Sequence, residues 1–185
     1  MRLQRLTSEL GARVRLRWQP YALRPVPVPG AFRFAGSYVE AAWRRAAALA
    51  QEDGIVYRLW AGDEFPRWSM PALEAGVAAQ RQGEAGFARF HLALFRALFV
   101  ESRTITAPAV LTAVAREAGL DVDRFATALQ TEEVRRDARE GFEAALNDCY
   151  VSAVPTVLVG TRRLIGLVPA AEYRAAIVDQ LASSA

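Results

Sequence analysis

The sequence predicts an α/β protein in which a block of helices interrupts a small frame of strands. An early segment, residues 13–18, alternates apolar and charged side chains, which is typical of a strand with one buried face. A late segment, residues 156–165, has the pattern of a two-strand hairpin, and the residues between the two segments show helical periodicity. An early strand and a late hairpin do not complete a sheet, so we interpret the helical block as an insertion. We place the frame in residues 1–35 and 150–185 and the helical insertion in residues 36–149.

The first part of the frame is predicted as a helix, an edge strand and an extended connection. Leucines at helical spacing occupy residues 3–10, and Gly11 is a plausible stop for that helix. In the strand, Val14, Leu16 and Trp18 alternate with arginines, as expected at a sheet edge. Residues 20–30 contain four prolines, which exclude a helix and favour an extended, polyproline-like chain.

The insertion is predicted as six helices, most of which start at a recognisable capping residue or proline. Ser37 caps the first, which runs to about Glu52, and a short extended piece follows over residues 55–60. Ser69 and Pro71 open the second, and Asp121 caps the fifth. The helix over residues 84–101 is the most amphipathic, and we assign to its apolar face Phe87, His91, Leu94, Phe95 and Leu98. The remaining helices are placed at 108–119, 122–129 and 132–147.

The return to the frame begins at Val154-Pro155-Thr156, where an apolar β-branched run follows a proline. Proline lacks the N–H that a ladder requires, so it belongs at the first residue of a strand or at an edge. We expect strands near 157–159 and 163–165, a tight turn at Gly160-Thr161, and a final helix over about 169–181.

Composition limits the classes of function. The chain has 185 residues, is 52% hydrophobic, and carries a formal net charge of +3. All of its basic residues are arginines, and they are scattered beside carboxylates or in turns, so we do not expect nucleic-acid binding. No segment resembles a membrane span or a secretory signal, and one cysteine excludes an internal disulfide, so we expect a cytoplasmic protein.

Several segments, taken in order, resemble the DsbA-like thioredoxin-fold family, and most closely its branch of FrnE-type oxidoreductases and 2-hydroxychromene-2-carboxylate isomerases. The resemblance covers essentially the whole chain. The stretches that carry it are residues 17–25, 90–99, 110–121, Val151-Ser152-Ala153-Val154-Pro155-Thr156 and 166–169.

The resemblance implies a thioredoxin-like fold in which Val154-Pro155 forms a cis-proline loop. In that family the loop faces the active site, and Val154, Pro155 and Thr156 would bind the backbone of an extended substrate or a thiol compound. The family usually has glycines near Tyr150 and Ala153, where this sequence has side chains, so we expect a narrower cleft beside Pro155 and do not carry the family's substrates over to this chain.

The family's redox motif, a Cys-x-x-Cys at the start of the first helix, does not occur in this sequence. Residue 1 corresponds to a position several residues inside that helix, and the central strand before it is also missing from the sequence. We therefore expect a start codon assigned too late or a truncated gene rather than a natural short form.

Three functions follow as hypotheses. The first is a DsbA/FrnE-like thiol–disulfide oxidoreductase that acts on protein thiols, with its redox motif outside this chain. The second is an isomerase- or transferase-like enzyme that uses glutathione as co-substrate. The third is a catalytically silent protein-binding module, which could complete its sheet with a strand from a neighbour or from a second copy in a homodimer. No catalytic residue, metal ligand or resident cofactor is assigned within the chain.

Three other features have a functional and a structural interpretation, and we favour the structural one for each. Cys149 is either a thiol near the substrate groove or a small buried apolar residue. His91 lacks the companions that a metal site needs. The aromatic residues of 32–68 would be core rather than the lining of a groove.

Overall fold

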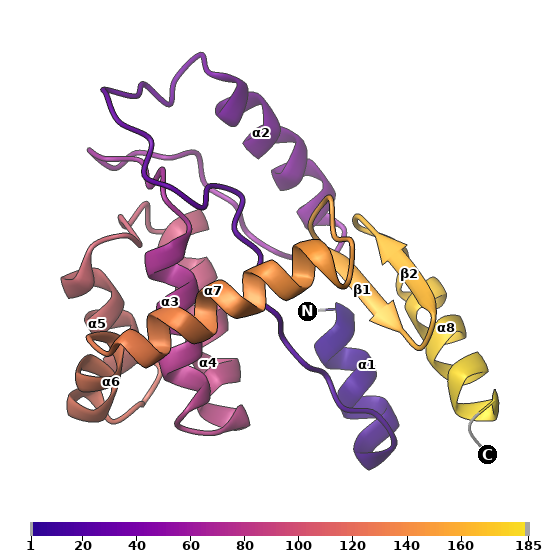
Figure 1. Ribbon diagram of the computed structural model, residues 1–185. Coiled ribbons are helices and arrows are strands. Elements are labelled where there is room, and N and C mark those ends of the chain that lie inside the picture. Colours follow the sequence, from indigo (N-terminus) through magenta and orange to yellow (C-terminus); the bar gives the residue numbers. More distant parts are fainter. Residues whose placement is uncertain (1, 184–185) are drawn as a thin grey trace. The chain divides into compact units, whose positions relative to one another are not determined.

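The computed structural model describes residues 2–183 and divides into two compact units (Figure 1). Unit 1 comprises Met1–Tyr21 and Glu143–Ala185, and unit 2 comprises Ala22–Phe142. These bounds differ from the predicted frame and insertion, which meet at residues 35/36 and 149/150.

The described residues are mostly helical. Four elements build unit 1: α1 (Arg2–Leu10), β1 (Thr156–Val159), β2 (Arg162–Ile165) and α8 (Ala170–Ser183). The helices of unit 2 are α2 (Tyr38–Gln51), α3 (Met70–Gln80), α4 (Glu84–Phe99), α5 (Pro108–Glu117) and α6 (Val122–Leu129). α7 (Glu132–Asn147) continues from unit 2 into unit 1, and a short 3₁₀ turn, η1 (Gly11–Arg13), follows α1.

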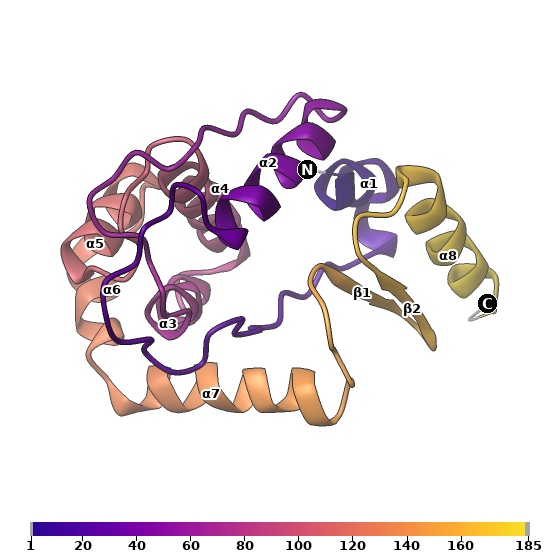
Figure 2. The same ribbon diagram turned by 90° about the horizontal axis from the view of Figure 1, so that it is seen from above.

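The small sheet of unit 1 is the antiparallel hairpin of β1 and β2, which pairs Thr156 with Ile165 and Val159 with Arg162. One face of the hairpin packs against α1 and α8, which lie beside it in both views (Figures 1 and 2). The core of this unit is made of Leu6, Leu164, Tyr173 and Ala176, with Leu3, Val157, Val159 and Val168 at its margin. This is the α/β frame that the sequence predicts, reduced to two strands within the described residues.

The predicted edge strand at residues 13–18 is wrong. Val14 has the extended backbone of a strand, with φ −134° and ψ 131°, but no residue of the segment belongs to a strand. A strand needs hydrogen bonds to a neighbour as well as an alternating sequence, and the only sheet among the described residues consists of β1 and β2. The alternation of arginine and apolar residues therefore predicted the local conformation but not the pairing.

Unit 2 is built around α3, in which every residue from Ala75 to Ala79 is buried. Three alanines of this helix, Ala75, Ala78 and Ala79, have no exposed surface, so neighbouring helices can approach α3 closely. α4, α5 and α6 all contact α3. Phe90 of α4 and Phe125 of α6 are fully buried, with ring centroids 5.4 Å apart.

The buried side of α4 differs from the prediction. Its buried residues are Gly86, Phe90 and Ala97, whereas Phe95, assigned to the apolar face, is 47% exposed. A Cβ at Gly86 would lie 2.9 Å from a methyl carbon of Leu120, so the absence of a side chain there permits close packing. The helix is apolar over more than one face, and the shape of its neighbours decides which face is buried.

The aromatic residues of 32–68 form a core cluster beside α2, as the structural interpretation expects. Its buried members are Phe34, Val39, Trp43, Trp60 and Phe65. The indole N–H of Trp43 donates to the carbonyl of Arg58 at 2.9 Å, so its polar group is satisfied inside the cluster. Trp68 lies apart from the buried members and donates to the carbonyl of Pro25 at 3.2 Å.

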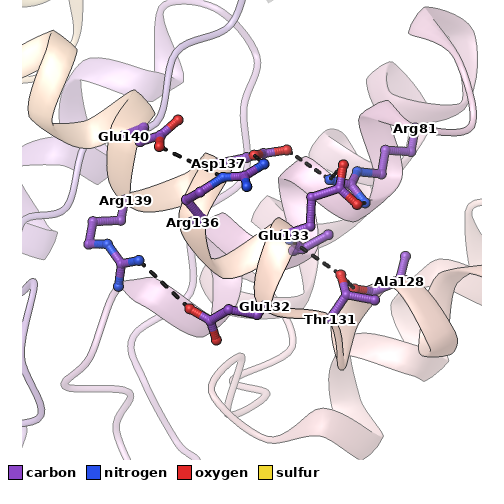
Figure 3. A network of polar contacts seen from close by, with 10 residues as sticks. Arg81, Ala128, Thr131, Glu132, Glu133, Arg136, Asp137, Arg139 and Glu140 are labelled. Carbon is purple, nitrogen blue, oxygen red and sulfur yellow. Dashed lines mark hydrogen bonds and ion pairs between the residues drawn. The ribbon is translucent and has the colours of Figure 1, made fainter.

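A network of ion pairs ties the end of α3 to α7 within unit 2 (Figure 3). The Arg81 guanidinium lies 2.7 Å from the Asp137 carboxylate and 3.1 Å from that of Glu133. The hydrogen bond from Arg81 holds the pKa of Asp137 below its usual value of 3.8. Arg136 pairs with both Asp137 and Glu140, which extends the network along α7.

Truncating Phe125 to alanine should strongly destabilise the protein. The ring is fully buried against Phe90, and removal of a buried phenylalanine side chain usually costs about 3–5 kcal/mol. Urea denaturation followed by circular dichroism measures the change. Phe95→Ala is the matched control because its ring is 47% exposed, and equal losses for the two variants would contradict the assignment of the core.

Candidate functional site

The residues predicted to bind substrate lie in the loop that joins α7 to β1. After α7 ends at Asn147, the N–H of Cys149 donates to the carbonyl of Ala144 at 3.0 Å, and that of Val151 donates to Ala145 at 2.9 Å. These bonds satisfy carbonyls at the end of the helix, which have no partner within it. Tyr150, between them, has a φ of 50°, a left-handed conformation that is uncommon for residues with a side chain.

Val154, Pro155 and Thr156 lie together where this loop enters β1. The Val154–Pro155 peptide bond is cis, the isomer that the sequence analysis expects. The Thr156 hydroxyl donates to the carbonyl of Ala153 at 2.6 Å, and the N–H of Gly166 donates to the carbonyl of Pro155 at 2.7 Å. The end of the loop is thus fixed both from within and from the residue that follows β2.

Val154 lies in an exposed part of the loop. Its side chain is 43% exposed, and residues 152, 153 and 155 are exposed as well. Among residues 2–183, no hydrogen bond is made by the N–H or the carbonyl of Val154. A backbone donor and a backbone acceptor without partners, on an exposed residue, are what an added strand or peptide requires.

An apolar surface adjoins this backbone on the hairpin. Thr156 pairs with Ile165 and Leu158 with Arg163, so these four side chains share the face opposite the α1/α8 core. Leu158 is 46% and Ile165 51% exposed. The site therefore combines free backbone groups with apolar contact area.

Arg163 is a residue of this site that the sequence analysis missed, because it treated the arginines together, as residues scattered beside carboxylates or in turns. The two arginines have different partners. Arg162 forms an ion pair with Asp179 of α8 at 2.8 Å, whereas Arg163 donates to the carbonyls of Cys149 and Tyr150. Strand alternation was the available signal, since consecutive residues of a strand point to opposite faces.

Cys149 lies at the start of the same loop. It is a free cysteine and is half-buried, where the favoured interpretation was a buried apolar residue. Its carbonyl oxygen accepts the hydrogen bond from Arg163. Whether its thiol takes part in function stays a hypothesis.

His91 lies in unit 2, on α4, in contact with two aromatic rings. Its ring centroid is 5.3 Å from that of Phe87 and 4.6 Å from that of Phe95, both one helical turn away. Burial lowers the pKa of the imidazole from its usual value of 6.5 to about 4, so the ring is neutral at pH 7. This environment suits a packed aromatic residue, as the sequence analysis favours.

The described residues have few features that are typical of other kinds of site. Within the described part of the chain, no group of three or more His, Cys, Asp or Glu is arranged to hold a metal ion. No helix over residues 2–183 is both long and apolar enough to cross a membrane. A hollow of about 460 Å³ in unit 2 is lined by Arg58, Leu59, Ala61, Gly62, Arg96, Val100, Glu101 and Ser102, none of which the sequence singled out.

Comparison with known proteins identifies the class. The model of the DSBA-like thioredoxin domain matches residues 1–178, so the chain belongs to this family. It is 25% identical over 171 residues to the uncharacterized protein YwbO of Bacillus subtilis (strain 168), covering 92% of this chain and 84% of YwbO.

Two solved structures share the fold. A putative protein disulfide isomerase from Nitrosomonas europaea superposes with a TM-score of 0.82 at 18% identity, over 100% of this chain and 90% of that one. A probable DsbA oxidoreductase from Streptomyces coelicolor gives a TM-score of 0.67 at 20% identity, over 78% and 61% of the respective chains. At these identities the likeness supports the fold, and the expected α/β, thioredoxin-like class is confirmed.

Replacing His91 by phenylalanine should flatten the dependence of stability on pH between 7 and 5. Between the folded pKa of about 4 and the usual 6.5 the unfolded state binds more protons, so wild-type stability is complete above 6.5 and is lost as the pH falls toward 4. The variant should therefore lose less stability than wild type when the pH falls from 7 to 5. Because the ring is partly exposed, we expect the two losses to differ by up to about 1 kcal/mol. Urea unfolding at the two pH values measures this difference. Parallel curves for the two proteins would show that His91 does not titrate in this range.

Proposed function

We propose that this chain is a thiol–disulfide oxidoreductase-type protein of the DsbA/FrnE branch whose loop at Val154, Pro155 and Thr156 binds the extended backbone of a thiol-bearing peptide. The observation that carries the proposal is that Val154 is an exposed residue whose N–H and carbonyl make no hydrogen bond among the described residues, within a chain of the DSBA-like family. A peptide paired with this residue would lie along the apolar surface of Leu158 and Ile165, both about half exposed. Protein thiols and glutathione are the partners that fit this description.

Disulfide exchange in this class uses two cysteines, so we assign substrate binding, rather than electron transfer, to these 185 residues. In disulfide exchange a thiolate attacks one sulfur of a disulfide, forms a new S–S bond, and releases the other sulfur as a thiolate. A second cysteine then attacks the mixed disulfide and frees the product. Completing both steps needs two cysteines, and the sequence contains one, Cys149.

The cysteine count favours a second candidate, a catalytically silent protein-binding module. Such a protein would bind peptides through the same loop and would show no turnover. Insulin reduction by the 185-residue protein tests this, and the intact mass and N-terminal sequence of the protein from its own cells show whether a Cys-x-x-Cys accompanies it. A homodimer, which we retain as a proposal for this module, would appear as a concentration-dependent mass in sedimentation.

The glutathione-dependent branch is a third outcome of the same experiments. It predicts tight binding of glutathione itself together with thiol-dependent isomerase activity. The oxidoreductase proposal predicts that extended cysteine-containing peptides bind at least as well as glutathione does. Comparing dissociation constants for the two ligands on one protein preparation separates the two functions.

Val154→Asp should weaken the binding of reduced glutathione at least tenfold. The added carboxylate would stand beside the backbone groups that bind the ligand and would repel the two carboxylates of glutathione. Titration of the ¹⁵N-labelled protein, followed through the amide signals of Val154 and Thr156, gives the dissociation constant.

Val178→Asp is the matched control for this measurement. Val178 lies on α8 of the same unit and is 49% exposed, against 43% for Val154. The control should bind like wild type. If both aspartates weaken binding equally, the effect is one of net charge. If neither glutathione nor a cysteine-containing peptide shifts an amide of the loop, the proposed site is wrong.

A further inference from the structure

We propose that Arg163 is a positioning residue for the binding loop: it holds the turn between α7 and β1 in the conformation that presents the backbone of Val154. This inference rests on the proposed function, and it names a residue outside the three that the sequence assigns to the site. Arg163 belongs to β2, so the strand that pairs with β1 would also set the shape of the loop before β1.

The guanidinium of Arg163 bridges two consecutive carbonyls of the turn. Nη2 donates to the carbonyl of Cys149, and Nη1 donates to that of Tyr150 at 3.4 Å. Within the described residues, neither carbonyl accepts another hydrogen bond. Arg163 is therefore the residue of β2 that binds these two carbonyls of the turn.

These two hydrogen bonds flank a residue whose backbone conformation is uncommon. Tyr150 is in the left-handed region, at φ 50°, and its side chain is 71% exposed, so packing of the ring does not explain the conformation. The N–H groups on either side of Tyr150 are held by the end of α7, at Ala144 and Ala145. The carbonyls of Cys149 and Tyr150 accept hydrogen bonds from Arg163, so this side of the turn is held as well.

A second hydrogen bond holds the other end of the loop. The Thr156 hydroxyl donates to the carbonyl of Ala153 at 2.6 Å. Ser152 thus lies between the turn held by Arg163 and the carbonyl of Ala153, and Val154 follows Ala153 directly. Releasing the Arg163 end would let the segment before Val154 sample other conformations, and ordering them again on binding would lower affinity.

An arginine suits this position better than a lysine. Its planar guanidinium carries donors in a fixed fork and can serve two carbonyls at once, whereas a lysine ammonium acts as a point charge on a flexible stem. Its positive charge also lies beside the C-terminal end of α7, where a cation is favoured. Lysine should therefore restore part, but not all, of the effect.

Arg162 provides a control that differs by one position along the strand. It is exposed like Arg163, but its guanidinium pairs with Asp179 rather than with the loop. Loss of either charge changes the net charge equally. Only loss of Arg163 removes the contacts to Cys149 and Tyr150.

The experiment compares Arg163→Met, Arg163→Lys and Arg162→Met with wild type in three measurements. These are amide hydrogen exchange at Cys149 and Val151, the dissociation constant for reduced glutathione, and the urea midpoint. We expect Arg163→Met to speed exchange at both amides at least fivefold and to weaken glutathione binding about tenfold, with a urea midpoint equal to that of Arg162→Met. Arg163→Lys should fall between Arg163→Met and wild type, and Arg162→Met should match wild type in exchange at these amides.

The outcomes separate this inference from the proposed function. If the Arg163→Met and Arg162→Met variants exchange at the same rates at Cys149 and Val151, Arg163 does not position the loop and the inference is overturned. A urea midpoint that falls only in Arg163→Met, with exchange faster throughout unit 1, would also overturn it by showing a general structural role. If wild type does not bind glutathione or a cysteine-containing peptide at all, the proposed function fails, while the exchange rates still decide whether Arg163 holds the turn.

Discussion

The pairing of β1 with β2 is the interaction on which the site depends. One face of this hairpin packs on α1 and α8, through Val157, Val159 and Leu164, so the two strands are fixed in register and orientation. Because alternate residues point to opposite faces, the same register places Thr156, Leu158, Arg163 and Ile165 on the other side. Burial of one face of the hairpin thus determines which side chains the opposite face offers to a ligand and to the loop.

Proline and threonine then fix where the loop ends and the strand begins. Pro155 cannot donate a ladder hydrogen bond, so pairing starts at Thr156, and the Thr156 hydroxyl turns back to the carbonyl of Ala153. The carbonyl of Pro155 still accepts the N–H of Gly166. Val154, one residue before the proline, is left with both backbone groups unpartnered among the described residues, and the proposal that the loop binds a ligand rests on this property.

Unit 2 shows a different way of building a core. Small residues of α3 and Gly86 of α4 allow close approach of neighbouring elements, and the rings of Phe90 and Phe125 fill the space between helices. Polar contacts lie outside this core, in the network of Arg81, Glu133 and Asp137. Membership of the DSBA-like family accounts for the combination of such a helical unit with a small sheet.

Local chemistry in the sequence was sufficient to predict most helices. Ser37 and Asp121 cap α2 and α6 as expected, with hydrogen bonds from the N–H groups of Glu40 and Arg124, and the predicted bounds of α6 and α7 are those observed. Caps, prolines and apolar periodicity act over a few residues, so they can be recognised without knowledge of the fold. The hairpin, with its turn at Gly160, was predicted for the same reason.

Tertiary structure decided what depends on partners distant in sequence. Residues 13–18 alternate like a strand but have no ladder, because a strand exists only with its neighbour. The choice of Phe90 over Phe95 as the buried ring of α4, and the separation of Arg163 from Arg162, follow from which surfaces the neighbouring elements present. The sequence by itself determined the local elements, and its resemblance to a family pointed to Val154, Pro155 and Thr156 as a candidate site. The hydrogen bonds from Arg163 to the loop arise only when β1 and β2 pair, because contacts across a hairpin join residues that no local pattern connects.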